Sequence, residues 1–206
     1  MTSPTTPTRD QTPAIARWAR TLLTLALVPL GWSAFHDPYA NVPLISDIDL
    51  AIHEFGHMLF QPFGIQFLGE TMVILGGSLT QVAFPAIFVG YFARAGNTRR
   101  DLHAATVCLW WTAMNMLAVA VYAADARAGV LMLVNGQTGH ESDGHDWHNL
   151  FARWGMLRSD TVIAGGMRDL AWLLFAASIV GGLYFVWRAA EPANEIHSQM
   201  DADRAA

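Results

Sequence analysis

Four long apolar runs constrain the fold of this chain more than any other feature of its sequence. They cover residues 14–35, 78–93, 103–124 and 169–188. Three of them reach the roughly 20 residues that a helix needs to cross the hydrocarbon core of a bilayer, and the run at 78–93 is slightly shorter. The chain is 53% hydrophobic and only 14% charged, which excludes a disordered protein, a coiled coil and most soluble folds. We therefore predict an all-α polytopic membrane protein.

The first apolar run also has the pattern of a cleaved signal peptide, because arginines precede it and the small residues Gly31 and Ser33 lie near its end. Trp32 and Phe35 lie around these small residues, and such bulky side chains favour a retained span. We expect a single membrane domain over 14–188. It should lie between a disordered tail at 1–13 and a polar tail at 189–206.

Charge and cysteine content limit the partners and the metal chemistry. All 12 basic residues are arginine, the net charge is -5, and no basic stripe is present to neutralise a phosphate backbone, so we expect no nucleic-acid partner. The single cysteine, Cys108, excludes a disulfide framework and a thiolate metal cluster. Any metal must therefore be bound by histidine, aspartate or glutamate side chains.

The segment at 45–62 has the apolar spacing of a helix but is unusually polar for a membrane span. It carries five ionisable side chains: Asp47, Asp49, His53, Glu54 and His57. A carboxylate at mid-membrane costs about 2.5–3.5 kcal/mol, so this segment would insert poorly on its own. We expect either a short or re-entrant helix or a fifth span, which gives about four to five transmembrane helices in total.

The glycine-rich residues 63–78 that follow favour a small hairpin or re-entrant loop. Gly76, Gly77 and Ser78 would turn the chain there and cap the next helix, or would let a substrate strand approach the backbone. Farther along, residues 135–150 form a polar loop, and an amphipathic pattern predicts an interfacial helix at about 146–157.

The arginines bear weakly on topology. If the segment at 45–62 dips into the membrane and returns, eight arginines lie on one side and four on the other, whereas a full crossing gives seven and five. The positive-inside rule weakly favours the first arrangement.

His53, Glu54 and His57 form an HExxH motif. Positions i and i+4 share one face of a helix, so both imidazoles can bind one Zn²⁺ while the glutamate reaches a water at the metal. Zinc lowers the pKa of that water to about 7, and the carboxylate takes its proton as the water attacks a carbonyl. We therefore predict a zinc site with His53 and His57 as ligands and Glu54 as the general base.

The HEFGH sequence in an apolar segment, followed by a glycine-bearing loop and an apolar span, resembles polytopic membrane zinc metalloproteases of the site-2 protease type. This resemblance implies a membrane-embedded peptidase. In that family an aspartate on a later transmembrane helix, in an Asn-Pro…Leu-Asp-Gly motif, completes the zinc shell. This chain has no such motif.

Several polar residues are candidates for the third ligand and for supporting roles. Asp125, which ends the run at 103–124, shares a helix face with Asn115 and Tyr122, so it could bind zinc while Asn115 binds substrate; alternatively it pairs with Arg127. His145 and His148 could bind the metal from the loop. The second-shell or substrate-binding candidates are Asp146, Asn115 and Asp49, and Asp49 lies one turn before His53.

The sequence thus predicts a zinc-dependent hydrolase that cleaves membrane or membrane-proximal peptides, in contact with lipid, in a bacterial cytoplasmic membrane. Two alternatives stay open. One is a histidine-rich di-iron oxidase or hydroxylase, whose ligands would be His53, His57, His103, His140, His145 and His148. The other is an inactive, protease-like scaffold that binds zinc and membrane partners.

Overall fold

The computed structural model describes residues 14–63, 69–94 and 100–188. Both expected tails lie outside the described residues. The helices in chain order are α1 (Ala14–His36), α2 (Ile45–Phe63), α3 (Gly69–Ala93), α4 (Leu102–Ala124), α5 (Asp146–Arg153), the short 3-10 helix η2 (Leu157–Ser159) and α6 (Asp160–Arg188). The part of the chain that the structure describes has no strand, only an isolated β-bridge between Met132 and Thr138.

Four helices, α1, α3, α4 and α6, are long and apolar enough to cross a membrane. This confirms the predicted all-α polytopic membrane fold. The span predicted at 169–188 is longer than expected, because α6 begins at Asp160. The expected interfacial helix is shorter than predicted, because α5 ends at Arg153.

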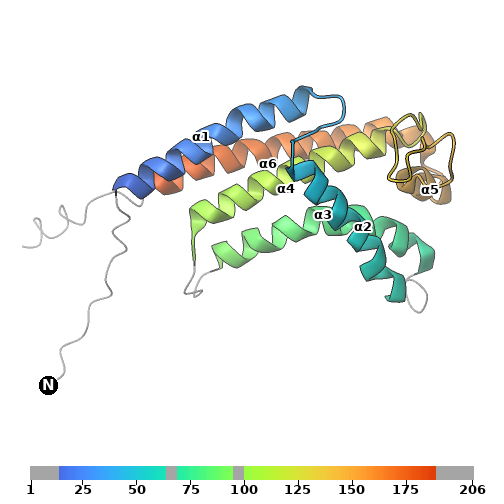
Figure 1. The fold of residues 1–206 in the computed structure, drawn as a ribbon, viewed down its shortest axis with the longest axis horizontal. Helices are drawn as coiled ribbons and strands as arrows, with labels where there is room; N and C mark the ends of the chain where they lie inside the picture. The colour runs from blue at the N-terminus through green and yellow to red at the C-terminus, as the bar shows by residue number, and fades with distance from the viewer. Residues whose placement is uncertain (1–13, 64–68, 95–99, 189–206) are drawn as a thin grey trace, which may run out of the picture.

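The four long helices alternate in direction along the long axis of the molecule (Figure 1). At one end of the bundle, Trp18 of α1 contacts Trp187 of α6, with ring centroids 5.7 Å apart. At the other end Phe35 stacks on Trp172, with centroids 3.7 Å apart. The chain leaves α1 at this second end, where Glu70 at the start of α3 also lies, bonded to Arg153 of α5.

The helix α2 therefore does not cross the bundle. It runs obliquely between the end of α1 and the beginning of α3, both of which lie at the second end (Figure 1). Asp49 near its start accepts a hydrogen bond from the indole N–H of Trp111, in the middle of α4 (2.7 Å). The HExxH segment is thus the short or re-entrant helix rather than a fifth span.

The hairpin predicted at 63–78 is wrong from residue 69 onward, and residues 64–68 lie outside the described residues. Gly76, Gly77 and Ser78 are buried inside α3 and neither turn the chain nor cap a helix. A Cβ on Gly56 would overlap the Gly76 carbonyl oxygen, so these glycines let the backbones of α2 and α3 meet. The sequence suggested a turn because glycine weakens an isolated helix, whereas here close helix packing favours it.

The central helix α4 carries most of the core. Trp110, 2% exposed, donates its indole N–H to the Leu27 carbonyl of α1 (3.0 Å). Around it, buried residues of α1, α4 and α6 such as Phe35, Leu117 and Phe175 form one apolar cluster. A second cluster around Val119, Leu150 and Phe151 fixes α5 on α4. The second cluster therefore positions the loop between α4 and α5, which faces α2.

Candidate metal centre

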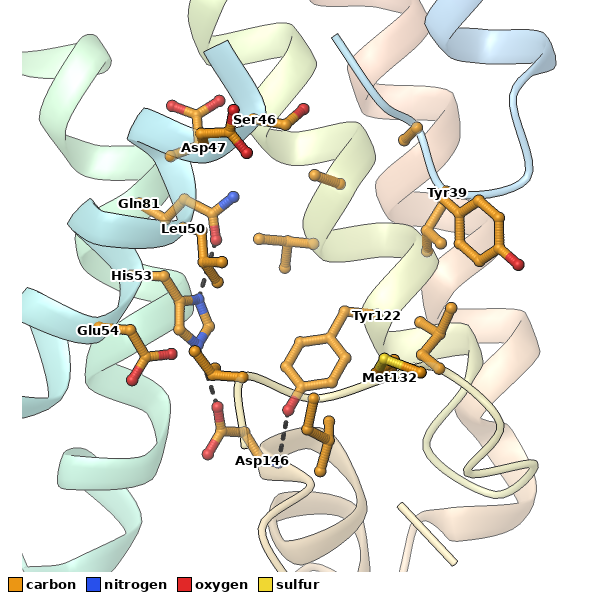
Figure 2. Close-up of a pocket in the computed structure, with 18 of the residues that line it drawn as sticks. Tyr39, Ser46, Asp47, Leu50, His53, Glu54, Gln81, Tyr122, Met132 and Asp146 are labelled. Carbon is orange, nitrogen blue, oxygen red and sulfur yellow. Dashed lines mark hydrogen bonds and ion pairs between the residues drawn. The ribbon is translucent and has the colours of Figure 1, made fainter. Parts of the chain in front are cut away.

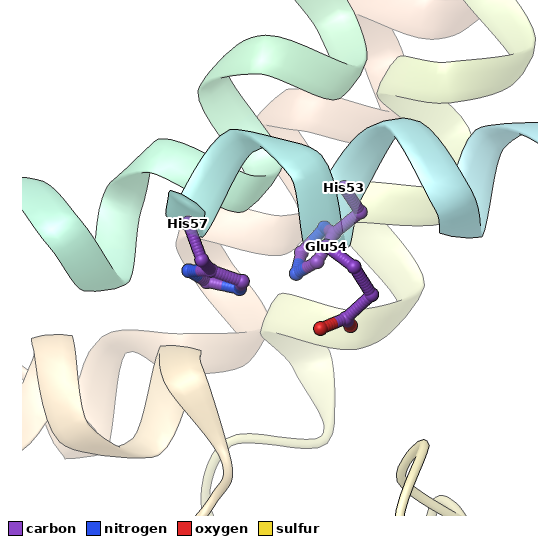
Figure 3. Close-up of side chains that lie close together, drawn as sticks. All are labelled: His53, Glu54 and His57. Atoms are coloured by element: carbon purple, nitrogen blue, oxygen red, sulfur yellow. The ribbon is translucent and has the colours of Figure 1, made fainter. Parts of the chain in front are cut away.

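His53 and His57 project from one face of α2, one helical turn apart, with Glu54 beside them (Figure 3). One potential ligand atom from each of these three residues lies within 4.8 Å of the others. His53 is 6% exposed and His57 is half-buried. The HExxH motif therefore forms the compact group that its spacing predicts.

Both imidazoles are oriented through their Nδ1 atoms. His57 Nδ1 lies 2.8 Å from the backbone carbonyl oxygen of Val73, and His53 Nδ1 lies 2.9 Å from Gln81 Oε1, both on α3. A carbonyl oxygen can only accept, so His57 Nδ1 must donate its proton. In the neutral tautomer that follows, the lone pair of His57 is on Nε2. Acceptors at Nδ1 are the usual outer partners of metal-binding histidines.

The Nε2 atoms of both histidines face the same carboxylate oxygen. Asp146 Oδ2, at the start of α5, lies 3.1 Å from His53 Nε2 and 3.2 Å from His57 Nε2. With neutral imidazoles this would bring three acceptors together with no proton between them. A proton on an imidazole or a bound metal cation at this point resolves the conflict, and two imidazole nitrogens with a carboxylate oxygen are ligand types that zinc accepts.

The pKa shifts report the same convergence. The hydrogen bond that His57 donates to Asp146 raises the pKa of His57 to about 9, even though burial opposes the charged form. Burial alone would raise the pKa of Asp146, but hydrogen bonds with His53 and His57 outweigh it and lower that pKa. The site thus favours positive charge at the point between the three side chains.

Two neighbours fix Asp146. Its backbone N–H donates to the Tyr122 hydroxyl of α4 (3.0 Å), and the next residue, Trp147, donates its indole N–H to Ser78 Oγ of α3 (3.1 Å). His145 is the N-cap of α5 and accepts from the His148 N–H. Because α3, α4 and α5 all hold this turn, the carboxylate of Asp146 is fixed opposite α2.

The structure gives the other predicted ligands, Asp125, His145 and His148, different partners. Asp125 accepts from the backbone N–H groups of Val130 (3.0 Å) and Leu131 (2.9 Å), and its carboxylate lies 3.3 Å from His145 Nε2. His148 Nδ1 bonds the carbonyl of Ala126 (2.7 Å). Asp125, His145 and His148 therefore fold the loop instead of forming the metal group.

The alternative pairing of Asp125 with Arg127 is also wrong. Arg127 instead bonds Asp160 at the start of α6, with Nη2 and Oδ1 3.1 Å apart. Burial explains the role of Asp125, because a carboxylate that is 6% exposed needs donors, and two backbone N–H groups of the following loop supply them.

Two of the predicted supporting residues have partners near the start of α2. Asp49 accepts from Trp111, and the acceptor beside His53 Nδ1 is Gln81, so Asp49 is not the partner of that imidazole. Asn115 is fully buried and donates to the carbonyl of Trp111 on its own helix, while its side-chain oxygen has no hydrogen-bond partner among the described residues. Together these residues join the start of α2 to α4.

The metal group opens into a cavity of about 820 Å³. His53, Glu54, Tyr122, Met132 and Asp146 are among the residues that line it, and Met132 lies on the far side of Tyr122 from His53 and Glu54 (Figure 2). No arginine or lysine is among the described residues that line it. The cavity therefore combines polar groups around His53 and His57 with apolar walls.

Sequence reasoning missed four contributors: Gln81, the Val73 carbonyl, Tyr122 as a partner of Asp146, and Gly77. A Cβ on Gly77 would lie 2.5 Å from His57 Nε2 and 2.6 Å from His53 Nε2. Of these four, only Gln81 could have been identified from the sequence, because an amide side chain in an apolar span requires a hydrogen-bond partner. The others depend on helix packing that no local pattern reveals.

Comparisons of the chain with protein-family models, with curated proteins and with solved structures found no match.

Proposed function

We propose that this membrane protein is a zinc-dependent peptidase that cleaves peptides in or beside the membrane. The observation that supports the proposal most strongly is the convergence of His53 Nε2 and His57 Nε2 on one oxygen of Asp146, at 3.1 and 3.2 Å. His53, His57 and Asp146 would hold the metal. Three protein ligands that leave a position open are typical of catalytic rather than structural zinc.

Zinc bound there would lower the pKa of water and polarise a carbonyl group. Glu54 stands beside the two histidines and lines the same cavity. Its carboxylate takes a proton from the attacking water and gives it to the leaving amine. Gln81 and the Val73 carbonyl keep the imidazoles turned toward Asp146 throughout, because they bond the Nδ1 atoms.

The cavity favours a peptide over an anionic lipid as the reactant. Its described lining includes the carboxylates of Asp37, Asp47 and Asp49 and lacks any arginine or lysine that could pair with a phosphate or fatty-acid carboxylate. We therefore expect the lipid bilayer to surround the protein without being its substrate, and a membrane protein or peptide to be the substrate.

The positions of the remaining histidines favour one metal over two. His103 bonds Thr24 Oγ1 (3.0 Å) near the far end of α4, while His145 and His148 bond Asp125 and Ala126. A di-iron oxidase would need most of these side chains around one centre. The missing Asn-Pro…Leu-Asp-Gly motif was the main reason to consider an inactive scaffold. Asp146 on α5 can supply the aspartate that this motif provides in site-2 proteases, so the missing motif no longer favours the scaffold.

We also propose a bacterial cytoplasmic membrane with the metal centre toward its outer side. Eight of the 12 arginines belong to segments that adjoin, in the sequence, the start of α1, the α3–α4 connection and the end of α6. The positive-inside rule makes that end cytoplasmic. The loop carrying Asp146 joins the opposite ends of α4 and α6.

The test is to purify the protein in detergent, measure its metals, and follow new peptide termini by mass spectrometry in a detergent-solubilised membrane-protein mixture. We expect one zinc per chain and cleavage by the wild type. Glu54→Gln should keep the zinc and lose cleavage, while Glu70→Gln, on an exposed surface pair with Arg153, should keep both. Two irons per chain, or equal cleavage by Glu54→Gln, would contradict the proposal.

A further inference from the structure

The hydroxyl of Tyr122 lies beside the metal group, at the end of a ring that is packed on two sides. Tyr122 belongs to the last turn of α4 and lines the same cavity as His53, Glu54 and Asp146. Its ring meets the imidazole of His53 edge to face, with centroids 6.0 Å apart, and stacks on the imidazole of His145 with centroids 4.4 Å apart. The ring therefore holds its hydroxyl toward Asp146 in a fixed direction (Figure 2).

This hydroxyl has an unused hydrogen. Its oxygen accepts the backbone N–H of Asp146 (3.0 Å), and a backbone N–H group can only donate. The O–H of Tyr122 is therefore not used in that bond, and it has no acceptor among the described residues. Because Tyr122 lines the cavity, its O–H can donate to a group that binds there.

The neighbouring side chains do not supply such a donor. The Nδ1 atoms of His53 and His57 bond Gln81 Oε1 and the Val73 carbonyl on α3, so neither is available to a reactant. No arginine or lysine is among the described residues that line the cavity. An oxygen that becomes negative during a reaction is stabilised strongly by a donor already fixed in place. The hydroxyl of Tyr122 is such a donor.

We propose that the Tyr122 hydroxyl donates a hydrogen bond to the carbonyl oxygen of the substrate as negative charge develops on it, which makes Tyr122 a catalytic residue beside Glu54. Water adds to the carbonyl carbon, the C=O electron pair moves onto the oxygen, and Tyr122 donates to that oxygen while keeping its own proton. Glu54 takes the proton from the water and passes it to the leaving nitrogen as the C–N bond breaks, which releases a carboxylic acid and an amine.

The catalytic role rests on the proposed peptidase function, whereas donation to an oxygen ligand at the metal group is a property of the site alone. The bond to Asp146 gives the hydroxyl a structural role as well, and three variants separate the two roles. Tyr122→Phe removes both. Trp147→Phe removes the bond to Ser78 Oγ and loosens the same turn of α5, but it keeps the hydroxyl. Tyr184→Phe, which removes an exposed hydroxyl near the other end of α6, is the matched control.

The probes are two zinc-binding ligands that differ in their oxygen atoms. A phosphinic analogue of an apolar dipeptide presents two oxygens on a tetrahedral phosphorus, whereas benzyl mercaptan binds through sulfur and presents no oxygen. Affinities are measured by calorimetry in detergent, after metal analysis shows one zinc per chain in each variant.

A hydrogen bond to a charged oxygen is worth roughly a factor of 10–100 in affinity. Tyr122→Phe should therefore bind the phosphinate about 10–100-fold more weakly, while its affinity for the thiol changes far less. Trp147→Phe should change both affinities equally, and Tyr184→Phe should change neither. Equal losses for the two ligands in Tyr122→Phe, or no phosphinate binding by the wild type, would overturn the proposal. So would equal phosphinate affinity in Tyr122→Phe and the wild type.

A peptide that the wild type cleaves gives a second measurement. Removing a donor to the developing negative charge should lower kcat about 100–1,000-fold in Tyr122→Phe, with little change in KM. Cleavage that requires Glu54 but not the Tyr122 hydroxyl would refute only the donor role. Phosphinate binding that depends on Tyr122, without cleavage of any peptide, would refute only the peptidase.

Discussion

Gly77 provides the sharpest test of how α3 holds the two histidines. A Cβ at this position would lie 2.5 Å from His57 Nε2 and 2.6 Å from His53 Nε2. Ordinary van der Waals contact begins at about 3.4 Å, so each ring nitrogen would have to move by nearly 1 Å. Metal–ligand distances tolerate only about 0.2 Å. Gly77→Ala adds a single methyl group and should therefore weaken metal binding by His53 and His57.

The expected loss can be bounded. Misplacing a functional group by about 1 Å costs roughly a hundredfold, and disturbing the outer partners of zinc ligands costs about 10–100-fold in metal affinity. We therefore expect Gly77→Ala to bind zinc about a hundredfold more weakly than the wild type, measured by competition with a chromogenic chelator in detergent.

The matched control is Gly90→Ala in the same helix, because a Cβ on Gly90 would meet nothing within 4 Å. Replacing glycine by alanine inside a helix stabilises it by about 0.5–1 kcal/mol when space allows, so this variant should keep its zinc and unfold at the same or a higher temperature. The reasoning is refuted if Gly77→Ala binds zinc as tightly as Gly90→Ala.

Three further changes test the elements that position Asp146. Tyr122→Phe removes the hydroxyl that accepts the Asp146 N–H and should cost about 1 kcal/mol of stability and weaken zinc binding severalfold, by thermal unfolding and chelator competition. Trp147→Phe keeps an aromatic ring but loses the bond to Ser78 and should lower thermal stability by about 1 kcal/mol; an unchanged midpoint would show that this bond does not hold α5. Asp125→Ala leaves two backbone N–H groups without their acceptor and should cost about 1–3 kcal/mol, with proteolysis of the loop beginning near residue 130; a loop as resistant as in the wild type would contradict its role in folding this loop.

The sequence predicts the features of the fold and the site that depend on local patterns. The four spans follow from run length, and the pairing of His53 with His57 follows from the helical period. The length of α3 was missed because Gly76 and Gly77 weaken an isolated helix, and only the close approach of α2 explains them. Local propensity and tertiary packing conflict at that crossing, and packing prevails.

The third candidate ligand could not be predicted from spacing. Asp146 lies 93 positions from His53 in the sequence, within a loop where the sequence pattern pointed to His145 and His148 as ligands and to Asp146 only as a supporting residue. What distinguishes them is burial and direction: His145 turns its ring against Tyr122, with centroids 4.4 Å apart, while Asp146 turns toward α2. Such directions arise from the packing of α5 on α3 and α4.

The most direct test of the central claim is the zinc site of the purified protein, measured by metal analysis and X-ray absorption in the wild type, Asp146→Asn and Asp143→Asn. Asp143 is an exposed acid in the same loop and serves as the matched control. We expect one zinc per chain in the wild type and in Asp143→Asn, with nitrogen and oxygen ligands at about 2.0–2.2 Å, and a large loss of zinc affinity in Asp146→Asn. Zinc bound equally well by Asp146→Asn, or no zinc in any form, would contradict it.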